Sequence, residues 1–293
     1  MPQADKEKTK TLSLGYSPCP NDTFIFYALV HGKVETGGLS FREELEDVEA
    51  LNRRAMEGLP DITKISFHAY CHLRDDYVLL RSGSALGKGC GPLIVGREPF
   101  LFDPAELPER LRKMKIAVPG GLTTASLLLL LFGGQGLREN MEPMLFSDIM
   151  PAVKEGRADA GLVIHEGRFT FENYGLHRLL DLGEWWEGEA GRPIPLGGII
   201  ARRALGRQTI KSVEAAIRES VLYSIGNPEE ARAYIRGHAQ EMEDRVIQSH
   251  IGLYVNDQTV WLDTEGEQAV EELFRRASEA RLTRPGSGPL FID

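Results

Sequence analysis

The amino-acid sequence predicts an α/β fold of two lobes with a ligand cleft between them. Patterns of strand and helix alternate from residue 11 to residue 205, as in a sheet that is covered by helices. The chain has 293 residues and exceeds the usual domain length of about 100–150 residues, which favours two lobes. We expect one α/β lobe from residues 1–97 and 198–293, with a helical C-terminal tail, and a second α/β lobe inserted at residues 98–197.

The first lobe is expected to begin with a strand over residues 11–17, a corner formed by two prolines, and a helix over residues 21–34. Asn21 and Asp22 are the candidate N-cap residues of this helix, because short polar side chains accept hydrogen bonds from its first N–H groups. Further strands are predicted over residues 38–47, 61–66, 77–82 and 91–98, and further helices over residues 47–58 and 67–75.

The second lobe repeats the same alternation before the chain returns to the first. Strands are predicted over residues 115–120, 141–147 and 160–167, and helices over residues 122–134 and 148–159. A strand over residues 193–205 then leads to helices over residues 210–225, 228–242, 244–255 and 264–282. In such folds a ligand lies where the carboxyl ends of strands and the N-termini of helices converge.

The charge and composition limit the classes of partner. A net charge of −9 argues against binding to nucleic acid or to an anionic membrane. The polar N-terminus lacks the apolar segment of a secretory signal, and apolar runs such as residues 127–132 are far shorter than a membrane span of about 20 residues. The three cysteines are too widely spaced for a disulfide framework or a metal cluster. We expect a cytoplasmic protein with a small-molecule partner.

Residues 118–132, VPGGLTTASLLLLLF, predict an anion-binding helix N-terminus. Two glycines follow the end of a strand and allow a ligand to approach the backbone, and a helix begins near Thr123. The N–H groups of the first helical turn and the hydroxyls of Thr123, Thr124 and Ser126 can bind a carboxylate or a phosphate. Simple capping of the helix by threonine and serine is the alternative.

Lys64 and Ser66 lie near the end of the strand over residues 61–66. Because side chains alternate across a strand, both point to the same face of the sheet. If that face lines the cleft, Lys64 supplies a positive charge and Ser66 a hydroxyl group. The alternative is that Lys64 is a solvated lysine at a strand end.

His165 ends a run of residues typical of a buried strand, AGLVIH. An ordinary histidine pKa of about 6.5 suits a general base near neutral pH, although a structural role is the alternative. The other histidines, His250 among them, fall in segments with a helical or exposed pattern. His68 and His72 have an i, i+4 spacing, but no third ligand accompanies them, so we predict no metal site.

Cys19 lies between the two prolines that precede the first helix. A thiol near a helix N-terminus can have a lowered pKa and act as a nucleophile. No histidine is close in sequence, however, and the prolines stiffen the turn. We favour a small buried residue in a rigid corner.

Several segments, taken in order along residues 12–205, resemble one enzyme family. They are GYSPCPNDTFIFYALVHGKV, LEDVEALNRRAMEG, TKIS, RSGSALGKGCGPLIV, VPGGLTTAS, GLVIHEGRFTF, LGEWW and PLGGIIARR. Together these segments resemble the 1,4-dihydroxy-6-naphthoate synthase family of the futalosine route to menaquinone. The pair SPCPNDTF and IHEGRFTF is the most specific part of the resemblance.

The resemblance implies a two-lobed fold similar to the periplasmic binding proteins of the second type. It also implies a lyase that converts cyclic dehypoxanthine futalosine to 1,4-dihydroxy-6-naphthoate without a metal or a redox cofactor. His165 matches the presumed general base of the family. Lys64 and Ser66 match one set of substrate contacts, and Thr124 and Ala125 match another.

The predicted site therefore combines a general base with polar residues from both lobes. The catalytic residue is His165, and the candidate substrate-binding residues are Asn21, Asp22, Lys64, Ser66, Thr123, Thr124 and Ala125. Asn21 and Asp22 are expected either to cap their helix or to touch the ligand. The expected partner is a small carboxylate substrate.

Other functions stay open on the sequence alone. The sister enzyme chorismate dehydratase shares the fold implied by the resemblance, and a non-catalytic protein that binds small carboxylates is the rival from another class. A ligand-sensing regulator is disfavoured because no helix-turn-helix precedes the fold. A homodimer is also open, and residues 183–191, GEWWEGEAG, form either a lid or an interface.

Overall fold

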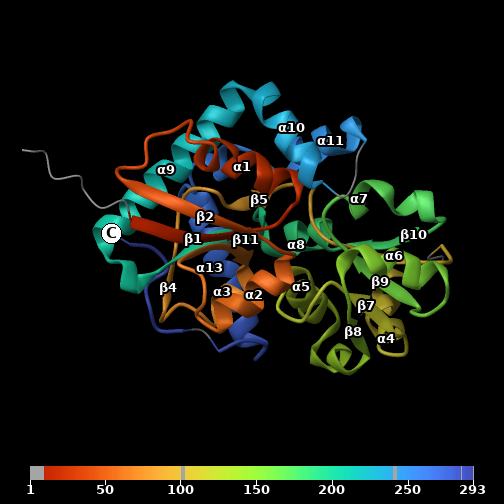
Figure 1. The fold of residues 1–293 in the computed structure, drawn as a ribbon. Helices are drawn as coiled ribbons and strands as arrows, with labels where there is room; N and C mark the ends of the chain where they lie inside the picture. The colour runs from red at the N-terminus through yellow and green to blue at the C-terminus, as the bar shows by residue number, and fades with distance from the viewer. Residues whose placement is uncertain (1–9, 100–102, 240–242, 285, 293) are drawn as a thin grey trace, which may run out of the picture.

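Two β-sheets covered by helices make up the two halves of the molecule (Figure 1). The computed structural model describes residues 10–99, 103–239, 243–284 and 286–292, and across these ranges the predicted α/β fold is confirmed. Residues 1–9, on which the prediction about a secretory signal partly depends, lie outside the described ranges. None of the helices within these ranges is both long enough and apolar enough for a membrane span.

The first sheet has the strand order β2, β1, β3, β11 and β4, and β5 pairs with β11. The bounds are β1 (Lys10–Tyr16), β2 (Leu39–Leu45), β3 (Ile62–Ser66), β4 (Tyr77–Leu79), β5 (Ala85–Gly87) and β11 (Ile194–Arg202). β1 runs parallel to β2 and β3, whereas β11 runs antiparallel to β3, β4 and β5. The strand predicted to return to the first lobe therefore lies beside β3.

The second sheet has the strand order β10, β6, β9, β7 and β8. The bounds are β6 (Leu93–Gly96), β7 (Ile116–Val118), β8 (Met141–Pro143), β9 (Ala160–Val163) and β10 (His177–Asp181). β6 pairs with β9 and β10, although the predicted domain boundary at residue 97 assigns this segment to the first lobe. Sheet membership depends on these long-range pairs, which the local pattern of β6 does not specify.

Helices cover both sheets and follow the predicted alternation (Figure 1). Those between the strands are α1 (Pro20–Val30), α2 (Val48–Met56), α3 (Phe67–Cys71), α4 (Leu107–Leu111), α5 (Thr124–Gly133), α6 (Phe146–Lys154), α7 (Gly167–Thr170) and α8 (Leu182–Ala190). The C-terminal ones are α9 (Arg207–Gly226), α10 (Pro228–His238), α11 (Asp244–Tyr254), α12 (Asp257–Val260) and α13 (Thr264–Glu279). Short 3₁₀ turns are η1 (Pro104–Glu106), η2 (Gln135–Asn140), η3 (Phe171–Tyr174) and η4 (Arg203–Leu205).

Alternation along the strands of the first sheet separates two hydrophobic cores. In β11, Ile199 and Ala201 belong to the core under α1 and α9, whereas Ile200 belongs to the core that contains residues of α2, α3 and α13. Neighbouring side chains of a strand point to opposite faces, so both faces of this sheet are buried. The second of these cores continues into the other half of the molecule through the leucines of α5 and Ile116 of β7.

The start of α1 differs from the prediction. The N-cap is Cys19 and the helix begins at Pro20, so the predicted capping roles of Asn21 and Asp22 are wrong. Proline suits the first helical position because its φ is preset and its missing N–H would have no partner there. Asn21 and Asp22 lie in the first turn instead, and their side chains are available for other contacts.

Residues 183–191, whose role the sequence leaves open, lie mostly within α8. Trp186 is completely buried and its indole N–H donates to the Pro193 carbonyl (3.2 Å). Trp185 is only partly buried, and its ring meets the edge of Phe132. Because Trp186 belongs to the main hydrophobic core, this helix is an integral layer of the fold.

The long C-terminal helix α9 packs along α1 (Figure 1) and fixes its position. The buried hydroxyl of Ser220 donates to the Ile25 carbonyl (2.6 Å) and accepts from the Leu29 N–H (3.0 Å). One side chain of α9 therefore satisfies two buried backbone groups of α1. This contact positions the helix that carries Asn21 and Asp22.

Ser220→Ala should lower the free energy of unfolding by about 1–3 kcal/mol, because it removes two hydrogen bonds to buried backbone groups of α1, each of which contributes about 0.5–1.5 kcal/mol. Ser212→Ala is the matched control on the same helix, at a position that is only partly buried and where we expect little change. Urea denaturation of both variants measures the difference. Equal stability of the two variants would show that the Ser220 contact does not hold α1.

Candidate active site

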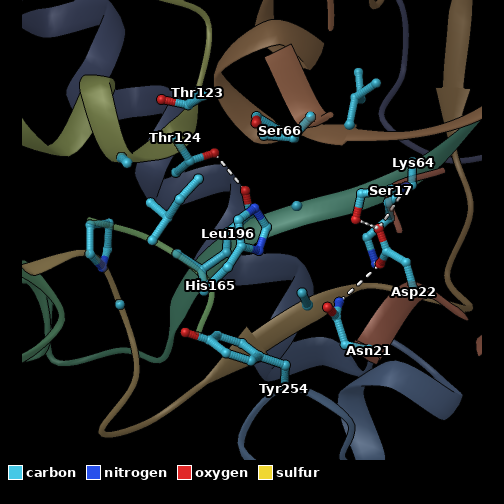
Figure 2. A pocket seen from close by; sticks show the side chains of 18 of the residues that line it. Ser17, Asn21, Asp22, Lys64, Ser66, Thr123, Thr124, His165, Leu196 and Tyr254 are labelled. Atoms are coloured by element: carbon cyan, nitrogen blue, oxygen red, sulfur yellow. Dashed lines mark hydrogen bonds and ion pairs between the residues drawn. The ribbon is translucent and has the colours of Figure 1, made fainter. Parts of the chain in front are cut away.

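A cavity of about 680 Å³, partly open to solvent, lies between residues of the two halves (Figure 2). Every predicted site residue lines it, so the structure brings the whole predicted set together: Asn21, Asp22, Lys64, Ser66, Thr123, Thr124, Ala125 and His165. The first sheet and its helices supply one wall, and the segments that follow β7 and β9 supply the other. A cleft between two lobes is a usual place for a small-molecule ligand.

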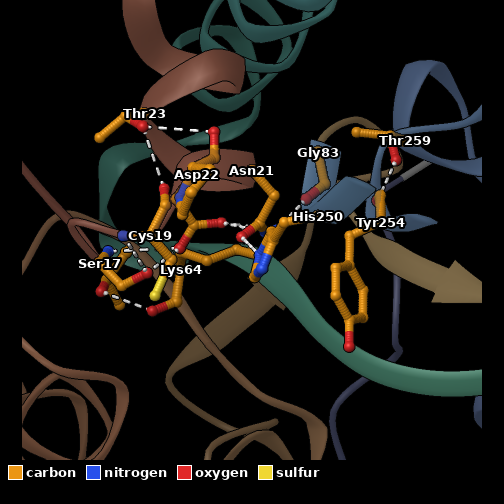
Figure 3. Close-up of polar contacts among 12 residues, drawn as sticks. Ser17, Cys19, Asn21, Asp22, Thr23, Lys64, Gly83, His250, Tyr254 and Thr259 are labelled. Atoms are coloured by element: carbon orange, nitrogen blue, oxygen red, sulfur yellow. Dashed lines mark hydrogen bonds and ion pairs between the residues drawn. The ribbon is translucent and has the colours of Figure 1, made fainter. Parts of the chain in front are cut away.

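Lys64 and Asp22 form a buried ion pair on the first wall (Figure 3). The Lys64 ammonium lies 3.4 Å from Asp22 Oδ1 and donates to the Gly83 carbonyl (2.5 Å). Only 5% of Lys64 and 4% of Asp22 are exposed, so the alternative of a solvated lysine is wrong. Burial lowers the pKa of Lys64, whereas the Asp22 carboxylate opposes this shift.

Further donors complete the surroundings of Asp22. Ser17 donates to Asp22 Oδ2 through its hydroxyl (2.8 Å) and its N–H (3.3 Å), and the Asn21 amide donates to Oδ1 (2.9 Å). A buried carboxylate requires such donors, because leaving it unpaired is costly. The role of Asp22 is therefore to anchor a network of side chains around the cavity.

Ser66 is held by a side chain from α2. The Asn52 amide donates to the Ser66 hydroxyl (3.2 Å) and accepts from the Ser66 N–H (2.9 Å). Because Asn52 is completely buried, it fixes both the backbone and the hydroxyl of Ser66 at the end of β3. Ser66 is thus oriented before any ligand arrives.

The N-terminus of α5 forms the opposite wall. The Thr123 hydroxyl accepts from the Ser126 N–H (3.2 Å), so Thr123 caps the helix as the capping alternative predicts. The Thr124 hydroxyl donates to the Leu196 carbonyl of β11 (2.6 Å). The backbone N–H groups of Thr124 and Ala125 open the helix, where N–H groups lack intrahelical partners and favour an anion.

His165 follows the carboxyl end of β9, where the sequence places it. Its backbone has a φ of 53°, an unusual conformation for a residue other than glycine. Its ring nitrogens make no hydrogen bond to any described residue, and its ring meets the edge of Phe146. Burial lowers the pKa of His165, while the Glu166 carboxylate opposes this shift. A neutral imidazole is therefore available to a ligand near neutral pH.

Comparison with known proteins now decides the family. A family model described as menaquinone biosynthesis matches residues 12–279. The chain belongs to the menaquinone biosynthesis family. A protein from Thermus thermophilus named 1,4-dihydroxy-6-naphtoate synthase is 48% identical over 283 residues, which cover 97% of this chain and 100% of that protein. A protein of the same name from Streptomyces coelicolor is 45% identical over 285 residues, which cover 95% of this chain and 96% of that protein. The predicted resemblance is thereby confirmed.

Solved structures show how the family relates to other proteins. A protein from Archaeoglobus fulgidus is 36% identical, with a TM-score of 0.83 and coverage of 93% of this chain and 98% of that one. The periplasmic aliphatic sulphonate-binding protein of Escherichia coli is 13% identical, with a TM-score of 0.61 and coverage of 97% and 94%. At this identity the likeness shows the fold alone, and it confirms the predicted similarity to periplasmic binding proteins.

Among the residues that line the cavity, three with polar side chains were not predicted as site residues from the sequence. Ser17 lies at the end of β1, and His250 and Tyr254 lie on α11. The sequence pattern places His250 in a helical or exposed segment; it lies on helix α11 but is buried, with 1% exposed. The i, i+4 spacing of His250 and Tyr254 places both on one face of the helix, but only packing of α11 against α1 turns that face to the cavity.

Cys19 does not line the cavity. Its thiol is buried, and burial raises the pKa of Cys19 well above its ordinary value. A protonated, inaccessible thiol is a poor nucleophile. The structure thus supports the interpretation of Cys19 as a small residue in the corner between β1 and α1.

Asp22→Asn should lower the free energy of unfolding by about 3–5 kcal/mol, because it leaves the buried Lys64 ammonium without its counter-charge. Lys64→Met should be similarly unfavourable, and the double variant should lose less than the sum of the two single changes. Denaturant titration of the four proteins measures this coupling. The exposed pair Lys113 and Glu109 provides a control cycle, for which we expect little coupling. Additive effects at Lys64 and Asp22 would contradict a coupled pair.

Proposed function

We propose that the chain is a cytoplasmic lyase that converts cyclic dehypoxanthine futalosine to 1,4-dihydroxy-6-naphthoate, with His165 as the general base. The names of two relatives that are aligned over nearly their whole length support this product. The observation that carries the proposal is that the imidazole of His165 lines the cavity between the two halves, makes no hydrogen bond to any described residue, and has a pKa that burial lowers. The substrate is a small carboxylate.

The N-terminus of α5 is the better candidate for the carboxylate of the substrate. Lys64 supplies positive charge to the cavity, but it is already paired with Asp22. The N–H groups of Thr124 and Ala125 begin a helix of 10 residues and carry the positive end of its dipole. An anion there would face the His165 side of the cavity, and Lys64 would contribute a weaker, longer-range attraction.

The chemistry of the conversion requires removal of a proton from a carbon next to a carbonyl. In our proposal this proton moves to an unprotonated ring nitrogen of His165, and the electron pair of the C–H bond enters the conjugated system. The bond between that system and the sugar-derived fragment then breaks, and the fragment leaves with the electron pair of this bond and takes up a proton. The imidazolium that forms is stabilised by the neighbouring Glu166 carboxylate, whose charge favours protonated His165. Exclusion of water by the ligand strengthens this interaction.

His165→Ala should retain the fold and lower kcat by about 10²–10⁴-fold, the usual contribution of a general base. The assay adds cyclic dehypoxanthine futalosine to purified protein and follows the appearance of the naphthoate product. His177→Ala, which changes an exposed histidine of β10, is the control and should keep full activity. Near-normal product formation by His165→Ala would remove this histidine from the mechanism. Binding of the substrate without turnover by the unaltered protein would favour a carboxylate-binding protein.

The pH dependence of kcat/KM should report the state of His165. Its pKa lies below the ordinary value of 6.5 because burial disfavours the imidazolium. The His165 imidazole is therefore unprotonated at neutral pH. We expect kcat/KM to fall only when the pH is below 6.5, where the imidazole becomes protonated. A pH–rate profile of the free enzyme measures this limb. An acidic limb centred above pH 6.5 would contradict the assignment.

A further inference from the structure

His250 lies on the wall of the cavity opposite the segment that carries His165. It belongs to α11, near the C-terminus, and only 1% of it is exposed. Its ring is nearly parallel to that of His165, with an interplanar angle of 15° and a centroid separation of 6.1 Å. Two imidazoles from distant parts of the chain therefore share one cavity.

A chain of contacts determines which nitrogen of His250 carries a proton (Figure 3). Asn21 donates from Nδ2 to Asp22 Oδ1 (2.9 Å), and that carboxylate oxygen is paired with Lys64. The amide oxygen of Asn21 is therefore the atom that meets His250 Nε2, at 2.9 Å. An amide oxygen only accepts hydrogen bonds, so Nε2 must donate. In a neutral imidazole the other nitrogen, Nδ1, then has a free lone pair.

Nδ1 of His250 is buried and has no hydrogen-bond partner among the described residues. A buried acceptor without a donor is unfavourable, and native proteins rarely leave one without a reason. Nδ1 does not become a donor by protonation near neutral pH, because burial and the nearby His165 lower the pKa of His250 well below its ordinary value. His250 lines the cavity, and its Nδ1 is a fixed acceptor for which the described residues supply no donor.

We propose that His250 is a substrate-binding residue whose Nδ1 accepts a hydrogen bond from a hydroxyl group of the substrate. Lys64, Asp22 and Asn21 hold it in the required tautomer. The ligand class is a hydroxylated carboxylate, with the carboxylate at the start of α5 and a hydroxyl of its sugar-derived part at His250. This assignment rests on the proposed function, and it explains how the substrate is oriented between two walls with His165 beside it.

Two substitutions of His250 distinguish the role of its Nδ1 from the role of its Nε2. Glutamine places an amide near Nε2 and can keep the contact to Asn21, but it offers no acceptor at Nδ1. Asparagine places an amide oxygen near Nδ1 and gives up the contact to Asn21. We expect His250→Gln to lower kcat/KM by about 10- to 100-fold, the usual effect of losing a buried hydrogen-bond acceptor. His250→Asn should recover a substantial part of this loss.

The ranking of the two variants tests the role directly. If His250 only supports Asn21, His250→Gln will be the more active variant, and the proposal is overturned. Thermal unfolding of both variants shows whether each is folded. Turnover by the unaltered protein combined with near-normal kcat/KM for His250→Gln would overturn this inference while leaving the proposed function intact. Absence of both binding and turnover in the unaltered protein would overturn the two together.

A spectroscopic measurement on the unaltered protein tests the protonation state of the His250 ring directly. In ¹⁵N-histidine NMR spectra, the signals that disappear in His250→Asn identify this ring. We expect a protonated Nε2 and an unprotonated Nδ1 in the free protein. Addition of cyclic dehypoxanthine futalosine should shift the Nδ1 resonance in the direction of a hydrogen-bonded nitrogen. A protonated Nδ1 in the free protein, or an Nδ1 resonance that the bound substrate leaves unchanged, would contradict the proposal.

Discussion

The buried ion pair between Lys64 and Asp22 is the constraint from which the cavity wall of the first lobe is built. Two buried opposite charges require hydrogen-bond partners in addition to each other. The Asp22 carboxylate accepts hydrogen bonds from Ser17 and Asn21 and pairs with the Lys64 ammonium. Lys64 also donates to the Gly83 carbonyl. Strand β3 and helix α1 are thereby joined at the point where each ends or begins. The ion pair therefore also holds the side chains of Ser17 and Asn21 in place beside the cavity.

The same burial that makes this pair costly keeps the two cavity histidines neutral. His165 and His250 each have a lowered pKa because an imidazolium would be poorly solvated. Neutral imidazoles can accept protons or hydrogen bonds, so the cavity is suited to a substrate that provides them. The left-handed backbone of His165 adds a local strain of a kind that is commonly found at functional sites.

Helix α5 joins the second wall to the first. The Thr124 hydroxyl donates to β11, and the Glu49 carboxylate of α2 accepts from the Leu122 N–H just before the helix begins (3.2 Å). The leucines of α5 extend the main core across both sheets. The N-terminus of α5, where we propose that the substrate carboxylate binds, is consequently held against the half of the molecule that carries Lys64 and Ser66. The proposed contacts from the two halves therefore line one cavity.

The sequence by itself determined the alternation of strands and helices, the family, and the polar residues at the ends of β3 and β9 and at the start of α5. These features depend on neighbours in the chain or on short motifs, which is why His165, Lys64, Ser66 and Thr124 could be identified. Tertiary structure alone decided that β6 belongs to the second sheet, that Lys64 is buried against Asp22, and that Asn21 meets His250. Each of these depends on contacts between distant segments, and His250 lies 229 residues from its partner Asn21. A helix pattern shows which residues share a face, but only packing shows what that face meets.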